Sequence, residues 1–492
     1  MLNKIFKDEA LAKNAAVARR VRDDAVTPTS QAEATGRTII VSNRMPSPNE
    51  KGATAGGLAV ALADAVTPGT IWFGWSGKRA DITSRSANIS VTDAVTYATI
   101  DIAESDYYKF YNGFANGALW PLFHFRTGLL RFHRPEYEAY RTVNRAYAEA
   151  LRPLLRPDDL IWIHDYQLMT LAAELRELGV TNRIGFFLHI PFVPPPLLVV
   201  LPPAPQLMAA LSACDIVGFQ TEGDRKAFLE SAEALLEARR NQYGCYEFNG
   251  RTVRAVVTPI GINAVKFAEL ARRAQNTAEA HRLDESLGDR ALVLGVDRLD
   301  YSKGLPQRFD AFGRLLYRFP EHCRRVHFLQ IAARSRQEVN SYQTLRRELD
   351  RRAGDINGEF SDVDWVPLRY MTHAVRRAAI AGFYRRAQIG LVTPLRDGMN
   401  LVAKEYIAAQ DEQDPGVLVL SRFAGAADEL TEALIVNPFD ADEVAEAIHF
   451  GLIMPLEERR ERHQALLQKV RRTTAARYCE EFLGYLRDPD KT

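Results

Sequence analysis

The chain has 492 residues, of which 47% are hydrophobic and 25% are charged, so it is long enough to form large hydrophobic cores. This length exceeds what one core normally organises and predicts at least two domains. The 63 basic and 62 acidic side chains nearly balance. Non-specific binding to nucleic acid or to an anionic membrane needs a positive excess, so neither partner is expected and anion binding must be local.

Residues 1–25 alternate charged residues with alanine and lack the continuous apolar segment of a signal peptide. We expect a flexible N-terminal arm over residues 1–36 rather than a targeting or oligomerisation helix. The most apolar stretch, residues 184–201, contains several prolines and His189 and is therefore no membrane span. The four cysteines lie far apart, without the spacing of zinc ligands. This pattern favours a reducing compartment and predicts a cytoplasmic protein.

Short β-branched or aromatic runs alternate with segments of helical periodicity, which is the pattern of parallel strands covered by helices. The runs form two groups and predict an α/β fold with two doubly wound, Rossmann-like domains. The expected strands are 38–42, 160–164, 183–189 and 215–219 in the first group, then 291–296, 326–331, 389–393, 417–421 and 433–436 in the second.

The segment between the two groups is polar and turn-rich, and Asn249 and Gly250 in it indicate a hairpin tip. We expect a first domain over residues 37–245 and a second over residues 246–455. From residue 456 onward the strands stop and charged helical patterns follow. Residues 456–492 are therefore expected to form a helical cap that crosses back to the first domain.

The first predicted strand ends at Arg44, and Gly56 and Gly57 follow before an apolar helix. Glycines at a helix start let backbone N–H groups approach a phosphate, which the helix dipole also favours. A plain turn explains two adjacent glycines equally well. The planar guanidinium of Arg44 favours the phosphate interpretation, because it is suited to bidentate phosphate binding.

The loop GVDRLDYSKG places Arg298 and Lys303 five residues apart beside a glycine, after a predicted strand. Two neighbouring cations repel each other unless they share an anion. A diphosphate is a suitable shared anion, and binding it would stabilise a departing nucleoside diphosphate. The alternative is a pair of solvated surface charges.

The segment QIGLVTPLRDGMNLVAKEY ends a buried strand, places Asp397 in a loop and begins a helix near Asn400. Asp397 can accept hydrogen bonds from sugar hydroxyls, and Glu405 can accept them from ribose. N–H groups at the helix start face outward and suit a phosphate. Helix capping by Asp397 is the competing structural interpretation.

Histidines stand at two strand ends, where ligands bind in open α/β sheets: His164, followed by Asp165, and His189. A lone histidine beside apolar residues is usually a core residue, so both interpretations stay open. Tyr111 and Trp120 lie in aromatic segments that either fill a core or pack against a sugar face.

Ten ordered motifs resemble the trehalose-6-phosphate synthase family, from about Thr38 to near the C-terminus: VSNR, AGGLAV, WFGWSG, LWP, IWIHDYQL, RIGFFLHIPF, GFQTE, RLDYSKGLPQRF, RDGMNLVAKEY and FAGAADEL. The resemblance implies the GT-B arrangement of two facing Rossmann-like domains. It also implies transfer of glucose from UDP-glucose, a co-substrate, to glucose-6-phosphate, with retention and without a cofactor or metal. It leaves a homo-oligomer possible.

The same resemblance implies roles for individual residues. The implied catalytic residues are Arg298, Lys303, His189 and Asp397. The implied donor-binding residues are Gly56, Gly57, Arg298, Lys303, Asp397, Gly398, Met399, Asn400, Leu401, Val402 and Glu405. The implied acceptor-binding residues are Arg44, Tyr111, Trp120, Asp165 and Arg336.

Retention requires either a covalent intermediate on a carboxylate or departure and attack on the same face. The sequence offers no carboxylate pair for the first route, which favours front-face transfer. Two other functions stay open: a related synthase making glucosylglycerol-phosphate or a pseudo-disaccharide, and a non-catalytic sugar-phosphate sensor. A third alternative is a nucleotide-sugar epimerase. The epimerase is disfavoured because no GxGxxG fingerprint follows the first strand.

Overall fold

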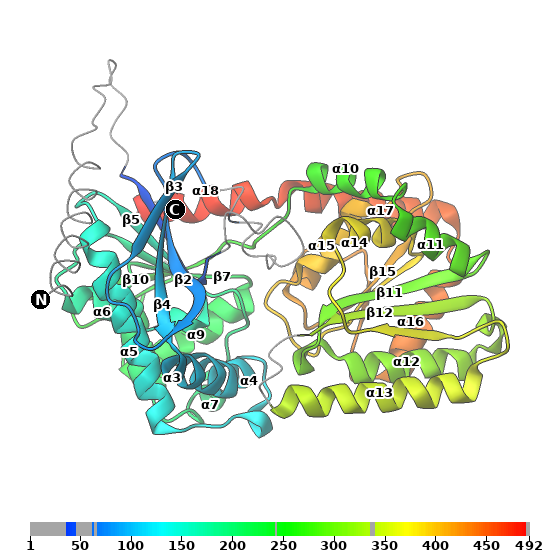
Figure 1. Ribbon diagram of the computed structural model, residues 1–492, viewed down its shortest axis with the longest axis horizontal. Coiled ribbons are helices and arrows are strands. Elements are labelled where there is room, and N and C mark those ends of the chain that lie inside the picture. The colour runs from blue at the N-terminus through cyan, green and yellow to red at the C-terminus, as the bar shows by residue number, and fades with distance from the viewer. Residues whose placement is uncertain (1–35, 46–61, 63–65, 242–243, 335–339, 489–492) are drawn as a thin grey trace, which may run out of the picture. The chain divides into compact units, whose positions relative to one another are not determined.

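A computed structural model describes residues 36–45, 62, 66–241, 244–334 and 340–488 of the chain. Arg37–Thr492 form one compact unit, and its strands make two sheets flanked by helices (Figure 1). The predicted N-terminal arm lies outside the described residues, apart from Gly36. None of the helices in the described ranges is long and apolar enough to cross a membrane.

The first sheet has ten strands in the order β3-β4-β2-β1-β5-β6-β7-β10-β9-β8. Neighbours from β4 to β10 are parallel, and both edges are completed by antiparallel strands. The strands are β1 (Thr38–Arg44), β2 (Ile71–Ala80), β3 (Asn88–Thr92), β4 (Val95–Ala103), β5 (Leu160–His164), β6 (Ile184–Phe187), β7 (Ile216–Phe219), β8 (Arg239–Arg240), β9 (Cys245–Phe248) and β10 (Arg251–Val257).

Helices connect these strands, and the longer ones, such as α5 and α9, bury one face. They are α3 (Glu104–Tyr107), the π-helix η1 (Tyr108–Leu119), α4 (Trp120–Phe123), η2 (Thr127–Leu129), α5 (Arg134–Leu151), η3 (Arg152–Leu154), η4 (Tyr166–Leu168), α6 (Leu171–Glu177), α7 (Pro195–Leu198), α8 (Ala204–Leu211) and α9 (Glu222–Leu236).

The second sheet has six parallel strands in the order β13-β12-β11-β14-β15-β16. The strands are β11 (Ala291–Arg298), β12 (Val326–Ala333), β13 (Leu368–Met371), β14 (Ile389–Val392), β15 (Val417–Ser421) and β16 (Leu434–Val436). The helices around them are α10 (Ala264–Ala274), α11 (Ala278–Leu287), η5 (Tyr301–Lys303), α12 (Leu305–Arg318), η6 (Pro320–His322), α13 (Asn340–Phe360), α14 (Arg377–Arg386), α15 (Leu401–Ala409), η7 (Gly425–Asp428) and α16 (Ala441–Ile453).

All nine strands predicted from the sequence are present, and both sheets are largely parallel, which confirms the α/β prediction. The sequence analysis did not identify β2, β4 or β13. In β2 the apolar residues Ile71–Trp75 are followed by a polar, increasingly exposed end, and only half of the strand is buried. Strand β13 is a four-residue edge strand whose last three residues are only half-buried.

The predicted boundary between residues 245 and 246 falls inside the first sheet. Strand β9 pairs with β10, and β10 pairs in parallel with β7, so the sheet continues to Val257. The hairpin tip between β9 and β10 is where the sequence placed it, and Asn249 and Gly250 both have positive φ. The hairpin is polar because it lies at an edge of the sheet, and a polar, turn-rich segment resembles a linker in sequence. We propose the boundary in residues 258–263 instead.

The C-terminal helices α17 (Leu456–Arg472) and α18 (Ala475–Arg487), red in Figure 1, follow the second sheet. Phe482 of α18 stacks on Trp162 of β5, with ring centroids 4.9 Å apart. Gly185 and Gly218 leave room for this ring, since a Cβ at either position would lie within 2.7 Å of Phe482. The last helix therefore packs on the first sheet.

The chain passes between the two sheets twice, once near Gly261 and once near Thr473, and these two crossings contact each other. A Cβ on Gly261 would lie 1.7 Å from the Thr473 carbonyl oxygen, so only glycine permits this approach. The buried ammonium of Lys404, in α15, donates to the Ile260 carbonyl at 2.9 Å and forms an ion pair with Glu429 at 3.0 Å. Lys404 also donates to the Thr473 hydroxyl at 3.4 Å, so one buried cation joins both crossings.

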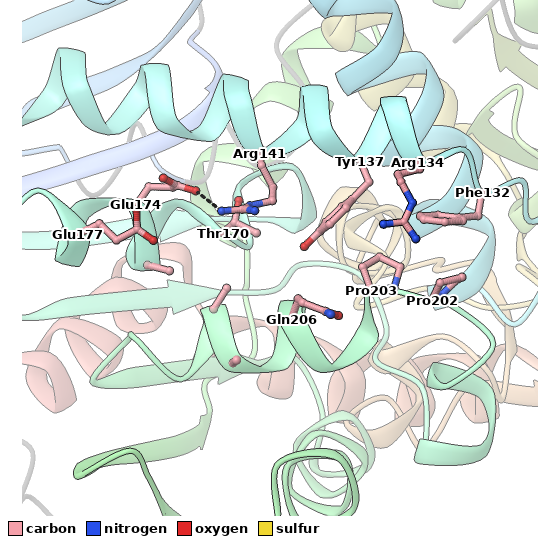
Figure 2. Close-up of a pocket in the computed structure, with 13 residues that line it drawn as sticks. Phe132, Arg134, Tyr137, Arg141, Thr170, Glu174, Glu177, Pro202, Pro203 and Gln206 are labelled. Carbon is pink, nitrogen blue, oxygen red and sulfur yellow. Dashed lines mark ion pairs between the residues drawn. The ribbon is translucent and has the colours of Figure 1, made fainter.

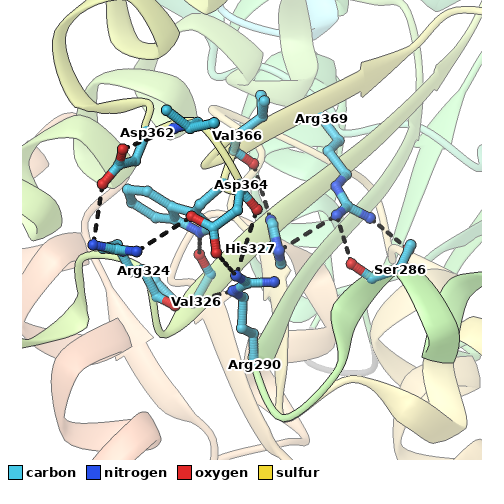
Figure 3. A network of polar contacts seen from close by, with 11 residues as sticks. Ser286, Arg290, Arg324, Val326, His327, Asp362, Asp364, Val366 and Arg369 are labelled. Atoms are coloured by element: carbon cyan, nitrogen blue, oxygen red, sulfur yellow. Dashed lines mark hydrogen bonds and ion pairs between the residues drawn. The ribbon is translucent and has the colours of Figure 1, made fainter.

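A polar network lies at the amino end of the second sheet, opposite the carboxyl ends of its strands (Figure 3). Arg290 and Arg324 both bind Asp364, at 3.0 and 3.3 Å. His327 Nδ1 donates to the Val366 carbonyl at 2.9 Å, and Arg369 donates to His327 Nε2 at 3.3 Å. Burial, with Arg369 and Arg290 nearby, lowers the pKa of His327 to about 4.

This lowered pKa predicts a stability that depends on pH. Because the unfolded imidazole has a pKa of about 6.5, the unfolded chain binds more protons than the folded chain from there down to about pH 4. The free energy of unfolding should therefore fall on acidification through this window, with a His327 contribution approaching about 1.4 kcal/mol per pH unit. Urea unfolding at a series of pH values tests this. His327→Gln should show a shallower slope than wild type, and equal slopes would contradict the assignment.

Candidate active site

Both sheets contain a point where the chain reverses its direction of strand addition. In the first sheet β1 and β5 are neighbours, with β2 beyond one and β6 beyond the other; in the second, β11 lies between β12 and β14. Loops diverge from such a point and leave room for ligands beyond the carboxyl ends of the strands. Arg44 and Arg298 are the last residues of β1 and β11, while Asp165 and Asp397 lie in the loops after β5 and β14.

Lys303 and Asp397 form an ion pair between two loops of the second sheet. Lys303 Nζ lies 2.5 Å from Asp397 Oδ2, and both side chains are largely buried. Burial alone would raise the pKa of Asp397, but the Lys303 ammonium and the Asn400 amide hold it below its ordinary value. Asp397 is therefore ionised, and Lys303 already has an anionic partner before any ligand binds.

Asn400, not Asp397, caps helix α15. The Asn400 side chain accepts a hydrogen bond from the Ala403 N–H at 3.2 Å, and its φ is +75°. It also donates to Asp397 Oδ2 at 3.0 Å, and the Gly398 N–H donates to Asp397 Oδ1 at 3.1 Å. The capping interpretation of Asp397 is thus wrong. The positive φ of a non-glycine residue is strain of the kind that collects at functional sites.

Trp120 brings the first sheet's helices into contact with the loop after β11. Its indole Nε1 donates to Asp300 Oδ1 at 3.4 Å, and the Arg298 guanidinium lies 5.5 Å from its ring centroid. Arg298 is exposed, whereas Lys303 is only 8% exposed. The two cations therefore occupy different environments.

His189 is hydrogen-bonded through both ring nitrogens. Gln220 Nε2 donates to Nδ1 at 3.2 Å, so Nε2 carries the proton and donates to His164 Nδ1 at 3.1 Å. Burial lowers the pKa of His189 to about 3, which keeps the ring neutral. The sequence analysis did not identify Gln220 as the residue that sets this tautomer, although it lies in the GFQTE motif.

The loop after β6 touches the loop after β14 at Gly398. A Cβ on Gly398 would lie 2.0 Å from the His189 carbonyl oxygen and 3.1 Å from Ile190 Cα. Gly425 packs against Gly398 in turn, because a Cβ on Gly425 would lie 1.8 Å from the Gly398 carbonyl oxygen. Three backbone segments are thus stacked in contact, and the position of His189 relative to Asp397 depends on these two glycines.

Asp165 connects the ends of β5 and β6. Its Oδ1 accepts a hydrogen bond from the His189 N–H at 3.2 Å. Its φ of +75° with ψ of 166° is unfavourable for a residue with a side chain. Surrounding contacts must compensate for this strain, which is typical of residues held for function.

Arg44 and Tyr111 lie in one neighbourhood at the end of β1. Arg44 is exposed, pairs in register with Trp75 of β2 and approaches Gly77. Tyr111 stacks on Tyr107 at 5.4 Å, and Tyr107 packs on Trp75 at 5.2 Å. The predicted site residues Gly56, Gly57 and Arg336 lie outside the described residues.

Helix α15 carries the remaining predicted donor residues. Glu405 binds Arg377 at 2.9 Å, and burial raises the pKa of its carboxyl group. Leu401 and Val402 are half-buried in the first turn, and Met399 is buried just before it. The structure thus keeps these residues on one loop and helix, with Asp397 at its start.

The sequence analysis missed His124, which packs at this junction. Its ring lies 4.1 Å from the Trp120 ring, and its Nδ1 donates to the Trp120 carbonyl at 2.8 Å. Burial lowers its pKa to about 4 against the charges of Asp300 and Asp397, which raise it. A neutral ring therefore lies beside the charged loops. Its position four residues after Trp120, in LWPLFHF, was the available signal.

Comparison with known proteins agrees with this geometry. Residues 36–488 match the model of glycosyltransferase family 20. A trehalose-6-phosphate synthase of Sinorhizobium fredii is 47% identical over 461 residues, which are 92% of this chain and 98% of that protein.

Two similar solved structures carry ligands. A UDP-forming alpha,alpha-trehalose-phosphate synthase from Burkholderia xenovorans, in complex with glucose-6-phosphate, is 45% identical with a TM-score of 0.89, over 92% of this chain and 100% of that one. A structure from E. coli bound with UDP-2-fluoro glucose is 43% identical with a TM-score of 0.88, over 92% and 99% of the two chains. This chain belongs to glycosyltransferase family 20.

Proposed function

We propose that this chain is a UDP-forming alpha,alpha-trehalose-phosphate synthase. It transfers glucose from UDP-glucose to glucose-6-phosphate, with retention, and releases UDP and alpha,alpha-trehalose-6-phosphate. The observation that carries this proposal is the contact between the two sets of loops: Trp120 beside Arg298, and His189 against Gly398. Acceptor and donor residues therefore converge on one place, as a transfer reaction requires.

On the donor side, Arg298 and Lys303 are proposed to bind the diphosphate. Lys303 exchanges part of its contact with Asp397 for a phosphate oxygen, which leaves Asp397 an acceptor for hydroxyls of the transferred glucose. The His189 ring, neutral and fixed by Gln220, orients the same sugar. Glu405, beyond the helix start, accepts from ribose hydroxyls, while Leu401 and Val402 pack near the nucleoside.

We propose front-face transfer as the mechanism. The bond between the anomeric carbon and the β-phosphate oxygen breaks while the acceptor hydroxyl attacks from the same face, and that phosphate oxygen takes the hydroxyl proton. Asp397 is a poor nucleophile for the alternative route, since its oxygens bind Lys303, Asn400 and Gly398. The cations stabilise the charge that develops on the departing diphosphate.

The direct test incubates the purified chain with glucose-6-phosphate and UDP-, GDP- or ADP-glucose in turn. NMR should identify alpha,alpha-trehalose-6-phosphate with UDP-glucose, and both anomeric carbons should have the α configuration. Absence of a disaccharide phosphate with every donor would refute the proposal. Product from another donor alone would identify a related synthase with a different nucleotide preference.

Arg44 is proposed to hold the acceptor phosphate. Arg44→Ala should raise the KM for glucose-6-phosphate by roughly tenfold or more while kcat changes less, because the lost interaction is mainly ground-state binding. Steady-state kinetics at saturating UDP-glucose measures this. Arg44→Lys should recover part of the affinity, since the charge remains. An unchanged KM in Arg44→Ala would remove Arg44 from the acceptor site.

A cytoplasmic location is also proposed. All four cysteines are free thiols, which suits a reducing compartment. Expression of a tagged chain followed by fractionation tests this, with recovery in the membrane or periplasmic fraction as the contradicting result.

A further inference from the structure

A pocket of about 510 Å³ opens among helices α5, α6 and α8, apart from the candidate active site (Figure 2). None of the proposed substrate-binding residues lines it. Its volume falls within the range of small-molecule sites, which combine apolar walls with a few polar groups. The residues that matter here are Phe132, Arg134, Tyr137, Arg141, Glu174 and Gln206.

One face of α5 supplies the polar groups. Arg134, Tyr137 and Arg141 are spaced by three and four residues, so they lie along a single side of the helix. Figure 2 shows Arg134 and Tyr137 directed toward the side of the pocket that carries Gln206 and Pro203, whereas Arg141 is directed toward Glu174. The pocket therefore has cationic and hydroxyl groups on one wall and an amide with an apolar surface on the other.

The charges in the pocket are unevenly compensated. Arg145 binds Glu174 at 3.3 Å and Glu177 at 3.0 Å, which neutralises the acidic end. Among the described residues, Arg141 has only a long ion pair, with Glu174 at 3.6 Å. Arg134 forms no ion pair within the ranges that the structure describes. Arg134 and Arg141 therefore give the pocket a cationic end.

We propose that this pocket binds a small hydroxylated anion. Its phosphate or carboxylate group lies between Arg134 and Arg141, and its hydroxyls bind Tyr137, Gln206 and the largely buried Glu174. Glu174 is suited to accept from a hydroxyl because only 6% of its side chain is exposed, so water competes little. The apolar face of the ligand packs on the Phe132 ring.

The same helix is hydrogen-bonded to the segment that begins at Asp165. Tyr140 of α5 donates to the Tyr166 carbonyl at 2.7 Å and accepts from the Met169 N–H at 2.9 Å. Asn144 of α5 donates to the Gln167 carbonyl at 3.1 Å. The segment then reaches Thr170, which lines the pocket. A ligand that shifts α5 would therefore act on Asp165 through the residues that directly follow it in the chain.

A second segment makes a similar connection. Residues 190–203 run from His189 to Pro203, and Pro203 forms part of the pocket wall before α8 begins. The pocket is thus joined to Asp165 and to His189 by two short segments. Occupancy of the pocket is expected to change the affinity for the acceptor, because Asp165 lies on that side of the site.

The test measures binding without turnover. Glycerol 3-phosphate is titrated calorimetrically into the full chain saturated with UDP and glucose-6-phosphate, which occupy the catalytic site. The double variant Arg134→Gln/Arg141→Gln is compared with wild type and with Arg351→Gln, an exposed arginine of α13. Glycerol serves as the uncharged probe. The substituted arginines are exposed, so all variants should fold, and thermal unfolding checks this.

The dissociation constant for glycerol 3-phosphate should rise at least tenfold in the double variant and stay unchanged in Arg351→Gln, with no binding of glycerol. Absence of binding to wild type, or equal affinity in the double variant, would overturn the site. In the kinetic arm, saturating glycerol 3-phosphate should shift the KM for glucose-6-phosphate at least twofold in wild type only. Equal shifts in wild type and double variant would overturn the coupling, as would no shift. The binding test does not depend on the proposed function, because its result would stand even if the chain lacked synthase activity.

Discussion

Arg298→Ala is expected to lower kcat by about 10²–10³-fold, as the loss of one preorganised donor to a developing negative charge typically does. Arg298 is exposed at the end of β11 and packs on the Trp120 ring, so no buried charge is left behind by the substitution. The loss should appear equally in kcat and kcat/KM, because the interaction strengthens as the diphosphate departs. Initial rates of UDP release at saturating substrates measure it.

Two comparison variants sharpen this result. Arg298→Lys keeps a cation without the planar fork and should retain intermediate activity. Arg477→Ala removes an exposed arginine of α18 that forms an ion pair along its own helix with Glu481, and should behave as wild type. Wild-type turnover in Arg298→Ala would show that leaving-group stabilisation rests on other residues.

Gly398→Ala should reduce kcat/KM by about 10²-fold, the effect of displacing catalytic groups by roughly 1 Å. The added methyl would lie 2.0 Å from the His189 carbonyl oxygen, and both partners are backbone, so neither can rotate away. The loops that carry His189 and Asp397 must separate. Overpacking of this kind also costs about 1–3 kcal/mol of stability. Activity assays and urea unfolding measure the two effects.

Gly354→Ala provides the matched control. Gly354 lies within α13 with nothing within 4 Å of an added Cβ, so alanine should leave activity unchanged. It should also stabilise the chain by up to about 1 kcal/mol, because alanine is the better helix former. Full activity in Gly398→Ala would show that the approach of the two loops is not required for transfer.

Much of the fold could be predicted from the sequence because buried parallel strands have a local signature. Runs such as 389–392 and 417–420 contain no polar side chain, and their burial on both faces requires this. Strand β2 was missed because its last five residues are partly or fully exposed. The sequence did not predict that the hairpin β9–β10 joins the first sheet, since nothing local in a polar edge strand indicates which sheet it joins.

The candidate site was predictable only in part. The sequence by itself determined which residue types stand at the strand ends, and its ordered motifs determined the family. Only the tertiary structure showed that Lys303 is paired with Asp397, that Asn400 caps α15 and that Gln220 fixes the tautomer of His189. These are contacts between residues up to 94 positions apart. The Lys303–Asp397 and His189–Gln220 contacts each join loops that follow different strands of one sheet, and no local pattern encodes which loops meet.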